Sequence, residues 1–212
     1  MTITNGYATV VDLSSYLTSD QLETSQYESA IEDASRWVDG YCGRRFYADT
    51  TATARKYPPP QDAGRPLGDR YAGEPLTVDD FWDLATLVVT DRSSTLTIDT
   101  HFQTEPAGIR APEENFPYWI LRPLQWVWQN SVYPGQTSIT VTAKWGWQTV
   151  PNAVKRATLM QAAWFIHGRD TRFGIAGFDA VGGVARIRGN EQAMQLLDRF
   201  RRGDTAPGFG MA

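Results

Sequence analysis

The sequence of 212 residues predicts an α+β protein, in which helices from the N- and C-terminal regions form a bundle and a mainly antiparallel β lobe is inserted between them. Apolar residues recur at helical spacing near both ends of the chain, and β-branched segments bounded by turn residues fill its middle. Stretches rich in Pro and Gly separate these regions. We therefore expect a helical core of residues 1–48 and 149–203, a β-rich lobe of residues 49–148 with Pro/Gly-rich loops, and a flexible tail of residues 204–212.

The first helical region follows a short helix or turn at residues 8–17. Ser25 and Glu28 have the spacing of a capping box, so we expect a helix over residues 26–42. Gly43 is expected to end it, because glycine readily adopts the left-handed conformation that follows many helices. The residues that recur on its apolar face are Tyr27, Ile31, Ala34, Val38 and Tyr41.

The middle of the chain alternates between loops and strands. Residues 58–75 contain five Pro and three Gly, which favours a long loop, and residues 106–117 also predict a loop. Residues 76–81, 85–91 and 94–100 predict strands, and 101–105 is expected to pair with its neighbours. Residues 118–128 are apolar and interrupted by Pro123. Residues 137–145 alternate, which predicts that Ile139, Val141 and Ala143 share one face.

The last region predicts two helices joined by an extended, flexible arm. Pro151 suits the first turn of a helix over residues 152–168, whose wide apolar face predicts a central position in the core. Residues 172–189 contain five Gly and predict the arm. Asn190 is expected to cap a final helix, and Arg199, Arg201 and Arg202 suit the negative end of its dipole. The apolar face of this helix comprises Ala193, Leu196, Leu197 and Phe200.

Composition narrows the classes of function. The formal net charge of -4 argues against a general polyanion-binding protein, because such proteins neutralise many phosphates with Lys and Arg. One Cys excludes an intrachain disulfide framework, and no run approaches the ~20 apolar residues of a membrane span. Aromatic residues make up 12% of the chain, with eight Trp, and titratable residues typical of catalysis are few. This balance favours assembly, because large rings stabilise both cores and interfaces.

Two other classes of function remain open at this point. An enzyme or ligand-binding protein would use Asp80 and His101 in the β lobe, although the adjacent Asp79 and Asp80 point to opposite faces of a strand and do not chelate together. A nucleic-acid-binding module would use the arginines at 44–45 and 199–202 and the rings of Trp145 and Trp147. Structural roles are favoured for these residues, and Cys42 is expected to be a buried thiol.

Three stretches in the same order resemble head-tail connector proteins of long-tailed bacteriophages, the adaptor or head-completion proteins. They are SAIEDASRWVDGYCGRRF, then VTAKWGWQTVPNAVKRATLMQAAWFI after the β region, and a closing LLDRFRR. This resemblance implies a structural protein of the virion neck, assembled in the host cytoplasm, without enzymatic activity, cofactor or metal. It implies a ring of twelve copies between the portal protein and the stopper or tail-terminator protein. DNA would pass through the ring without specific binding, and the β lobe is a candidate for contact with the capsid.

A ring needs two different contact surfaces on each copy. The candidate subunit interface comprises Tyr57, Arg65 and Tyr71 at the first loop and Phe173, Ile175 and Phe178 in the arm. Candidate contacts to the portal or tail are Arg199, Arg201, Arg202 and Phe209. A structural corner of Trp145, Gly146, Trp147 and Pro151 is expected to lock the β lobe onto the helical core.

Overall fold

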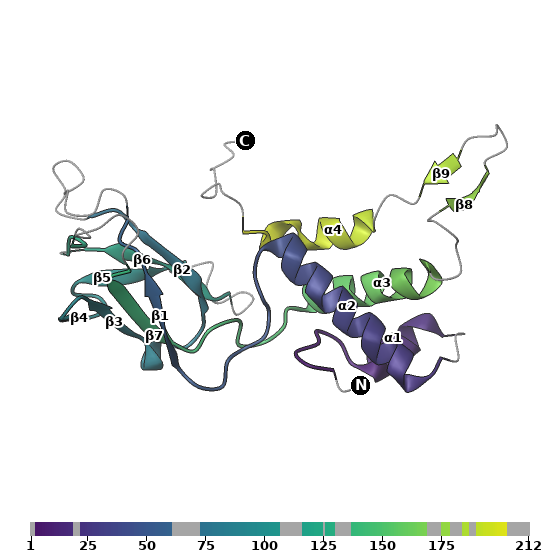
Figure 1. The fold of residues 1–212 in the computed structure, drawn as a ribbon, viewed down its shortest axis with the longest axis horizontal. Helices are drawn as coiled ribbons and strands as arrows, with labels where there is room; N and C mark the ends of the chain where they lie inside the picture. Colours follow the sequence, from purple (N-terminus) through teal and green to yellow (C-terminus); the bar gives the residue numbers. More distant parts are fainter. Residues whose placement is uncertain are drawn as a thin grey trace. The chain divides into compact units, whose positions relative to one another are not determined.

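The computed structural model describes residues 3–18, 22–60, 73–106, 116–124, 126–129, 137–168, 175–178, 184–186 and 190–202, with the backbone alone for 175–178 and 184–186. The chain divides into two compact units (Figure 1). The helical unit comprises Met1–Arg45 and Val150–Ala212, and the β unit comprises Phe46–Thr149. The predicted α+β class is confirmed: helices lie in both terminal regions of the chain, and the region between them is β.

The helical unit buries the apolar faces of its helices against one another. Its elements are α1 (Val10–Leu17), α2 (Thr24–Cys42), α3 (Asn152–Gly168), α4 (Glu191–Leu197) and the 3-10 turn η4 (Asp198–Phe200). Side chains of α1, α2 and α3 form one core, which includes Leu13, Leu17, Tyr27, Ile31, Ala34, Ala162 and Ile166. Within the described residues, no helix combines the length and the apolarity that crossing a membrane requires.

Helix α1 is tied to α3 through Asp12. Its carboxylate accepts hydrogen bonds from the backbone N–H and the hydroxyl of Thr9, and the Asp12 N–H donates to Thr9 Oγ1, which completes a capping box. Lys155 Nζ on α3 lies 2.8 Å from Asp12 Oδ1. Hydrogen bonds from Lys155 and Thr9 stabilise the carboxylate and lower the pKa of Asp12 to about 2.

Helix α2 begins earlier than predicted. Its N-cap is Glu23, whose backbone N–H donates to Gln26 Oε1 at 3.1 Å, so the predicted box of Ser25 and Glu28 is wrong. Gln26 occupies the third helical position, from which a side chain reaches back to the cap. The end is as predicted: Gly43 has φ 63, and its N–H donates to Asp39 O at 2.9 Å.

Helix α3 starts directly after Pro151, whose carbonyl accepts the N–H of Lys155 at 3.0 Å. The buried face is less uniformly apolar than its sequence predicts, because Thr158 and Gln161 lie in it. Thr158 Oγ1 donates to Val154 O on the preceding turn, which satisfies the hydroxyl inside the core. The apolar residues displaced to half-buried positions are Leu159, Met160, Trp164 and Phe165.

The β unit contains two antiparallel sheets. The strands of the first lie in the order β1 (Thr53–Tyr57), β7 (Ile139–Ala143), β3 (Val88–Asp91) and β4 (Ser94–Leu96). Those of the second lie in the order β2 (Leu76–Phe81), β6 (Tyr118–Pro123) and β5 (Phe102–Glu105). Just beyond the strands, Gly146 N donates to Asp80 O at 2.6 Å and Trp82 N to Lys144 O at 3.2 Å, which joins the two sheets at one end.

The interior of the β unit lies between these sheets. Ile139, Val141 and Ala143 are all fully buried, so the predicted alternation of β7 is confirmed. The other members of the core come from both sheets and from the segments that follow β6 and β7, and include Leu76, Val78, Phe81, Val89, Phe102, Leu121, Trp128 and Trp145.

Several strands differ from the sequence prediction. Strand β1 was not predicted, and it pairs along β7 from Thr53↔Ala143 to Tyr57↔Ile139. The predicted strand 85–91 is shortened to β3, because the Asp83 carboxylate accepts the N–H of Ala85 and caps a 3-10 turn, η1 (Leu84–Thr86). The predicted strand 94–100 ends at Leu96, and Asp99 has a left-handed φ of 61. Strand β6 ends at Pro123, which has no N–H to continue the ladder.

The arm that we predicted to be extended and flexible contains two strands where it is described. Residues 175–178 form β8 (Ile175–Phe178) and residues 184–186 form β9 (Val184–Arg186), which pair antiparallel from Ile175↔Arg186 to Phe178↔Val184. The prediction weighed the glycines of 172–189 and overlooked the β-forming residues on both sides of Gly182 and Gly183, which favour a hairpin.

We predict that Asp12→Asn reduces stability in a pH-dependent way. The pKa of Asp12 is lowered in the folded chain, so its stabilising effect is present above the unfolded pKa and is lost as pH falls from about 4 to about 2. Urea unfolding at pH 7, 4 and 2.5 should therefore show a gap between wild type and variant that closes with acid. Asp33→Asn, an exposed carboxyl on α2, is the control. A gap that stays constant down to pH 2 would contradict the assignment.

Candidate functional site

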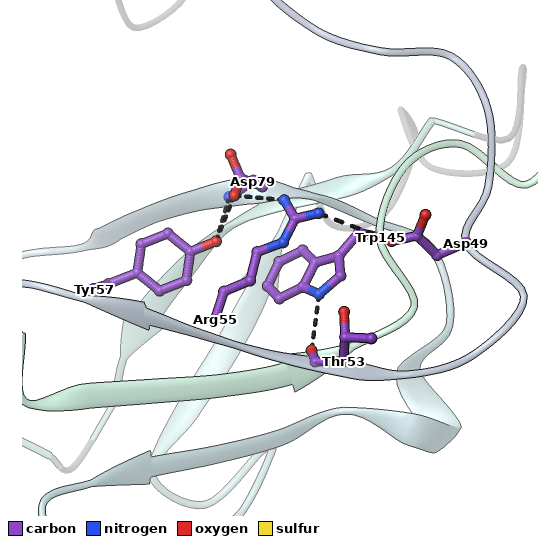
Figure 2. A network of polar contacts seen from close by, with 6 residues as sticks. All are labelled: Asp49, Thr53, Arg55, Tyr57, Asp79 and Trp145. Atoms are coloured by element: carbon purple, nitrogen blue, oxygen red, sulfur yellow. Dashed lines mark hydrogen bonds and ion pairs between the residues drawn. The ribbon is translucent and has the colours of Figure 1, made fainter. Parts of the chain in front are cut away.

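Strand β1 positions a polar network on the β unit (Figure 2). Arg55 and Tyr57 alternate along β1 and therefore share one face. Arg55 Nη1 lies 2.7 Å from Asp79 Oδ2 on β2, and Arg55 Nη2 lies 3.8 Å from Asp49 Oδ2. The Tyr57 hydroxyl donates to the same Asp79 oxygen at 2.8 Å and accepts the Asp79 N–H at 3.2 Å. This network links the edge strand of one sheet to the edge strand of the other.

Trp145 forms the floor of this network. The guanidinium of Arg55 lies 4.4 Å from the centroid of the Trp145 ring, at cation–π distance. The Trp145 Nε1–H donates to the carbonyl of Thr53 at 2.8 Å, so the fully buried indole has a partner for its one polar group. Burial is the main cause that raises the pKa of Tyr57 above its ordinary value, and the phenol therefore stays protonated and donates to Asp79.

Gly146 is required at the corner by its backbone and by its surroundings. Its φ is 94, a conformation that residues with a Cβ rarely adopt. A Cβ at this position would lie 1.8 Å from the carbonyl oxygen of Tyr47, far inside van der Waals contact. The close approach aligns the two ends of the β unit, because Asp49 N also donates to Trp145 O at 2.8 Å.

Two buried carboxylates hold tryptophans in the β unit. Asp80 is 4% exposed, and its Oδ2 accepts the Nε1–H of Trp147 at 3.2 Å. Asp91 is fully buried at the end of β3, and its Oδ2 accepts the Nε1–H of Trp126 at 3.1 Å and the N–H of Gln129 at 2.9 Å. Such bonds are what allows a carboxylate and an indole to be buried together. The bonded oxygen of each carboxylate thus has a structural role, whereas Asp91 Oδ1 is buried without a hydrogen-bond partner among the described residues.

Trp145, Gly146 and Trp147 of the predicted corner lie in the interior of the β unit, whereas Pro151 belongs to the helical unit. Trp147 is fully buried, and its ring centroid lies 5.0 Å from those of Phe46 and Phe116, both in the same unit. Trp145 contacts Tyr57 and Phe81, also in this unit. The role that we predicted for Trp145, Gly146, Trp147 and Pro151 in locking this unit onto the helices stays a prediction.

Asp80 and His101, the residues of the alternative ligand site, bond to different partners. Asp80 accepts from Trp147, whereas His101 Nδ1 accepts the N–H of Thr97 at 2.8 Å and its ring packs edge-on against Trp126 at 5.7 Å. Asp79 and Asp80 point to opposite faces of β2: Asp79 is half-buried and Asp80 buried, as their adjacency predicts. Among the described residues, no three His, Cys, Asp or Glu side chains gather in a group that could hold a metal ion.

The arginines that follow α2 and those at the end of η4 lie close together in the helical unit. The N–H of Arg202, just after η4, donates to Cys42 O at the end of α2 at 2.7 Å. Tyr41 Oη donates to Asp198 Oδ1 at 2.6 Å, and the Arg201 guanidinium lies 5.1 Å from the Tyr41 ring centroid. Burial raises the pKa of the Cys42 thiol to about 12, so this cysteine is a buried, protonated thiol, as predicted.

The predicted contact residues are described in part. Tyr57 is half-buried and its hydroxyl is bonded to Asp79, and Arg199, Arg201 and Arg202 lie at the end of the helical unit. Arg65, Tyr71, Phe173 and Phe209 lie outside the described residues, as do the side chains of Ile175 and Phe178. Their roles at subunit, portal or tail contacts stay predictions. Sequence reasoning missed Arg55 and Asp79; the alternation of Thr53, Arg55 and Tyr57 was the available signal.

We predict that Gly146→Ala destabilises the chain by about 2–5 kcal/mol, from a strained φ and from the clash with Tyr47. Calorimetric or urea unfolding measures this loss. The matched control is Gly40→Ala, because Gly40 lies inside α2 and a Cβ there meets nothing within 4 Å. Alanine at position 40 should stabilise α2 by about 0.5–1 kcal/mol. Equal effects at the two positions would argue against the constraint at Gly146.

We predict that the ring of Trp147 contributes more to stability than the ion pair of Arg55 and Asp79. Trp147→Ala should cost about 3–5 kcal/mol, because it empties a fully buried position. Arg55→Ala should cost only about 1–2 kcal/mol, since the side chains of Arg55 and Asp79 are 33% and 47% exposed and solvent screens their attraction. Urea unfolding should be followed by far-UV circular dichroism, because Trp147→Ala removes a tryptophan and thereby changes the fluorescence signal. The ranking is wrong if Arg55→Ala is the more destabilising change.

Comparisons with known proteins find a similar fold among solved structures. No protein-family model matches the sequence, and no curated protein matches it. Among solved structures, the chain is similar to a chain of the neck of an empty GTA (gene transfer agent) particle, computed with C6 symmetry. The TM-score is 0.53 at 13% identity, and the match covers 98% of this chain and 96% of that chain. The protein therefore has a fold similar to that of a chain of that neck, over a match that includes both the helical and the β unit.

Proposed function

We propose that this protein is a structural component of the neck of a phage-like particle. The single observation that carries the proposal is the fold match, which spans 98% of this chain and includes both units. A common helical domain alone would match many unrelated proteins, whereas a β unit inserted between these helices is a more specific arrangement. The three sequence stretches that resemble head-tail connector proteins point to the same assignment.

In this role, copies of the chain form a ring that joins the portal protein to the stopper or tail-terminator protein. The neck that contains the similar chain was computed with C6 symmetry. Rings of six copies and rings of twelve copies both contain a six-fold axis. We propose twelve copies, with DNA passing through the ring without specific binding. The β unit faces other components of the particle, and no catalytic step is involved. The interior bonds of Asp80 and Asp91 fit a rigid building block, since they hold large rings in fixed positions.

The assembly itself tests the proposal. Native mass spectrometry of the full chain, alone and mixed with the portal protein encoded in the same genome, should show a complex with six or twelve copies of this chain. Particles made without the chain should contain filled heads that are not joined to tails. A chain that is absent from purified particles and stays monomeric beside the portal would contradict the proposal.

A further inference from the structure

The helical unit carries a cluster of basic side chains at one end, which we call the arginine corner. It is assembled from two distant parts of the sequence, because the Arg202 N–H bonds to Cys42 O and brings the end of η4 against the end of α2. Tyr41 donates to Asp198 and lies beneath the Arg201 guanidinium, so these two charged side chains are close neighbours at the end of α2. The corner comprises Arg44, Arg45, Arg199, Arg201 and Arg202.

The opposite half of α2 is acidic. Residues 22–35 contain four carboxylates and no Lys or Arg, and we call this stretch the acidic segment. Glu28 and Glu32 are four residues apart and so lie on one face, where like charges repel. Asp33 is exposed beside them. This repulsion weakens an isolated helix.

The helix dipole does not account for this arrangement. The dipole acts within the first and last turns of a helix, whereas Glu28, Glu32 and Asp33 lie beyond the first turn of α2. Cys42 lies ten positions after Glu32, which corresponds to about 15 Å along the helix. That distance exceeds the Debye length of about 8 Å at physiological salt, so the segment and the corner of one copy barely neutralise each other.

We propose that the arginine corner of one copy binds the acidic segment of a second copy in a head-to-tail contact. This inference rests on the proposed ring, in which each copy presents two different surfaces to its two neighbours. Guanidinium groups pair bidentately with carboxylates, which suits five arginines facing Glu28, Glu32 and Asp33. A second copy is attracted at both surfaces, because each copy carries one arginine corner and one acidic segment.

Charge reversal tests the contact directly. Arg201→Glu alters an exposed residue of the corner, and the double variant Glu32→Arg/Asp33→Arg alters the segment. Each should weaken self-association about tenfold or more, measured by sedimentation velocity of the full chain alone and on the portal ring. An equimolar mixture of the two should restore association, because copies that alternate then pair opposite charges at every contact. Circular dichroism verifies that each variant is folded.

The controls separate the possible failures. Lys56→Glu, an exposed charge change on β1, should leave association unchanged. Rings that form equally well with the reversed charges, or a mixture that restores nothing, would overturn the inference and leave the proposed neck function intact. Wild-type chain that forms no ring even with the portal protein would overturn both. If Arg201→Glu abolishes binding to a labelled DNA duplex while self-association is unchanged, the corner binds nucleic acid and the inference is wrong.

Discussion

The β unit depends on the close approach of its two ends. The chain enters it through Phe46 and Tyr47 and leaves it through the corner of Trp145, Gly146 and Trp147. Gly146 packs against the Tyr47 carbonyl, and Asp49 donates to Trp145. A domain whose ends lie side by side can be inserted into another without stretching it, which is why α2 and α3 still pack together although the β unit separates them in sequence. A side chain at position 146 would disturb this arrangement.

The sequence predicted the elements whose signals are local. The 3.6-residue periodicity of α2, the left-handed Gly43 and the alternation of β7 each depend on a few neighbouring residues. Strand β1 was missed because it is short and mostly exposed, so its alternation carries little apolar contrast. Its partners, Ala143 to Ile139, lie over eighty residues away, and no local pattern reveals such a pairing.

The polar network shows the same limit. Asp79 and Asp80 look equivalent in sequence, yet one faces Arg55 and Tyr57 and the other accepts the indole N–H of Trp147 inside the core. The two-residue period of a strand predicts that they point apart, but it does not say what each one meets. Likewise, the arginines at 44–45 and 199–202 were two separate clusters in sequence. The bond from Arg202 to Cys42 makes them one surface.

That surface gives the chain a directional charge pattern. The formal net charge of -4 makes two copies repel weakly at long range, which disfavours random association. In the head-to-tail contact that we propose, electrostatic attraction favours the orientation that places arginines against carboxylates, so it selects the register more than it supplies affinity. A head-to-tail contact of this kind leaves one unused corner and one unused segment on any open chain of copies. Closure of the proposed ring would remove both, which would favour the complete assembly over its intermediates.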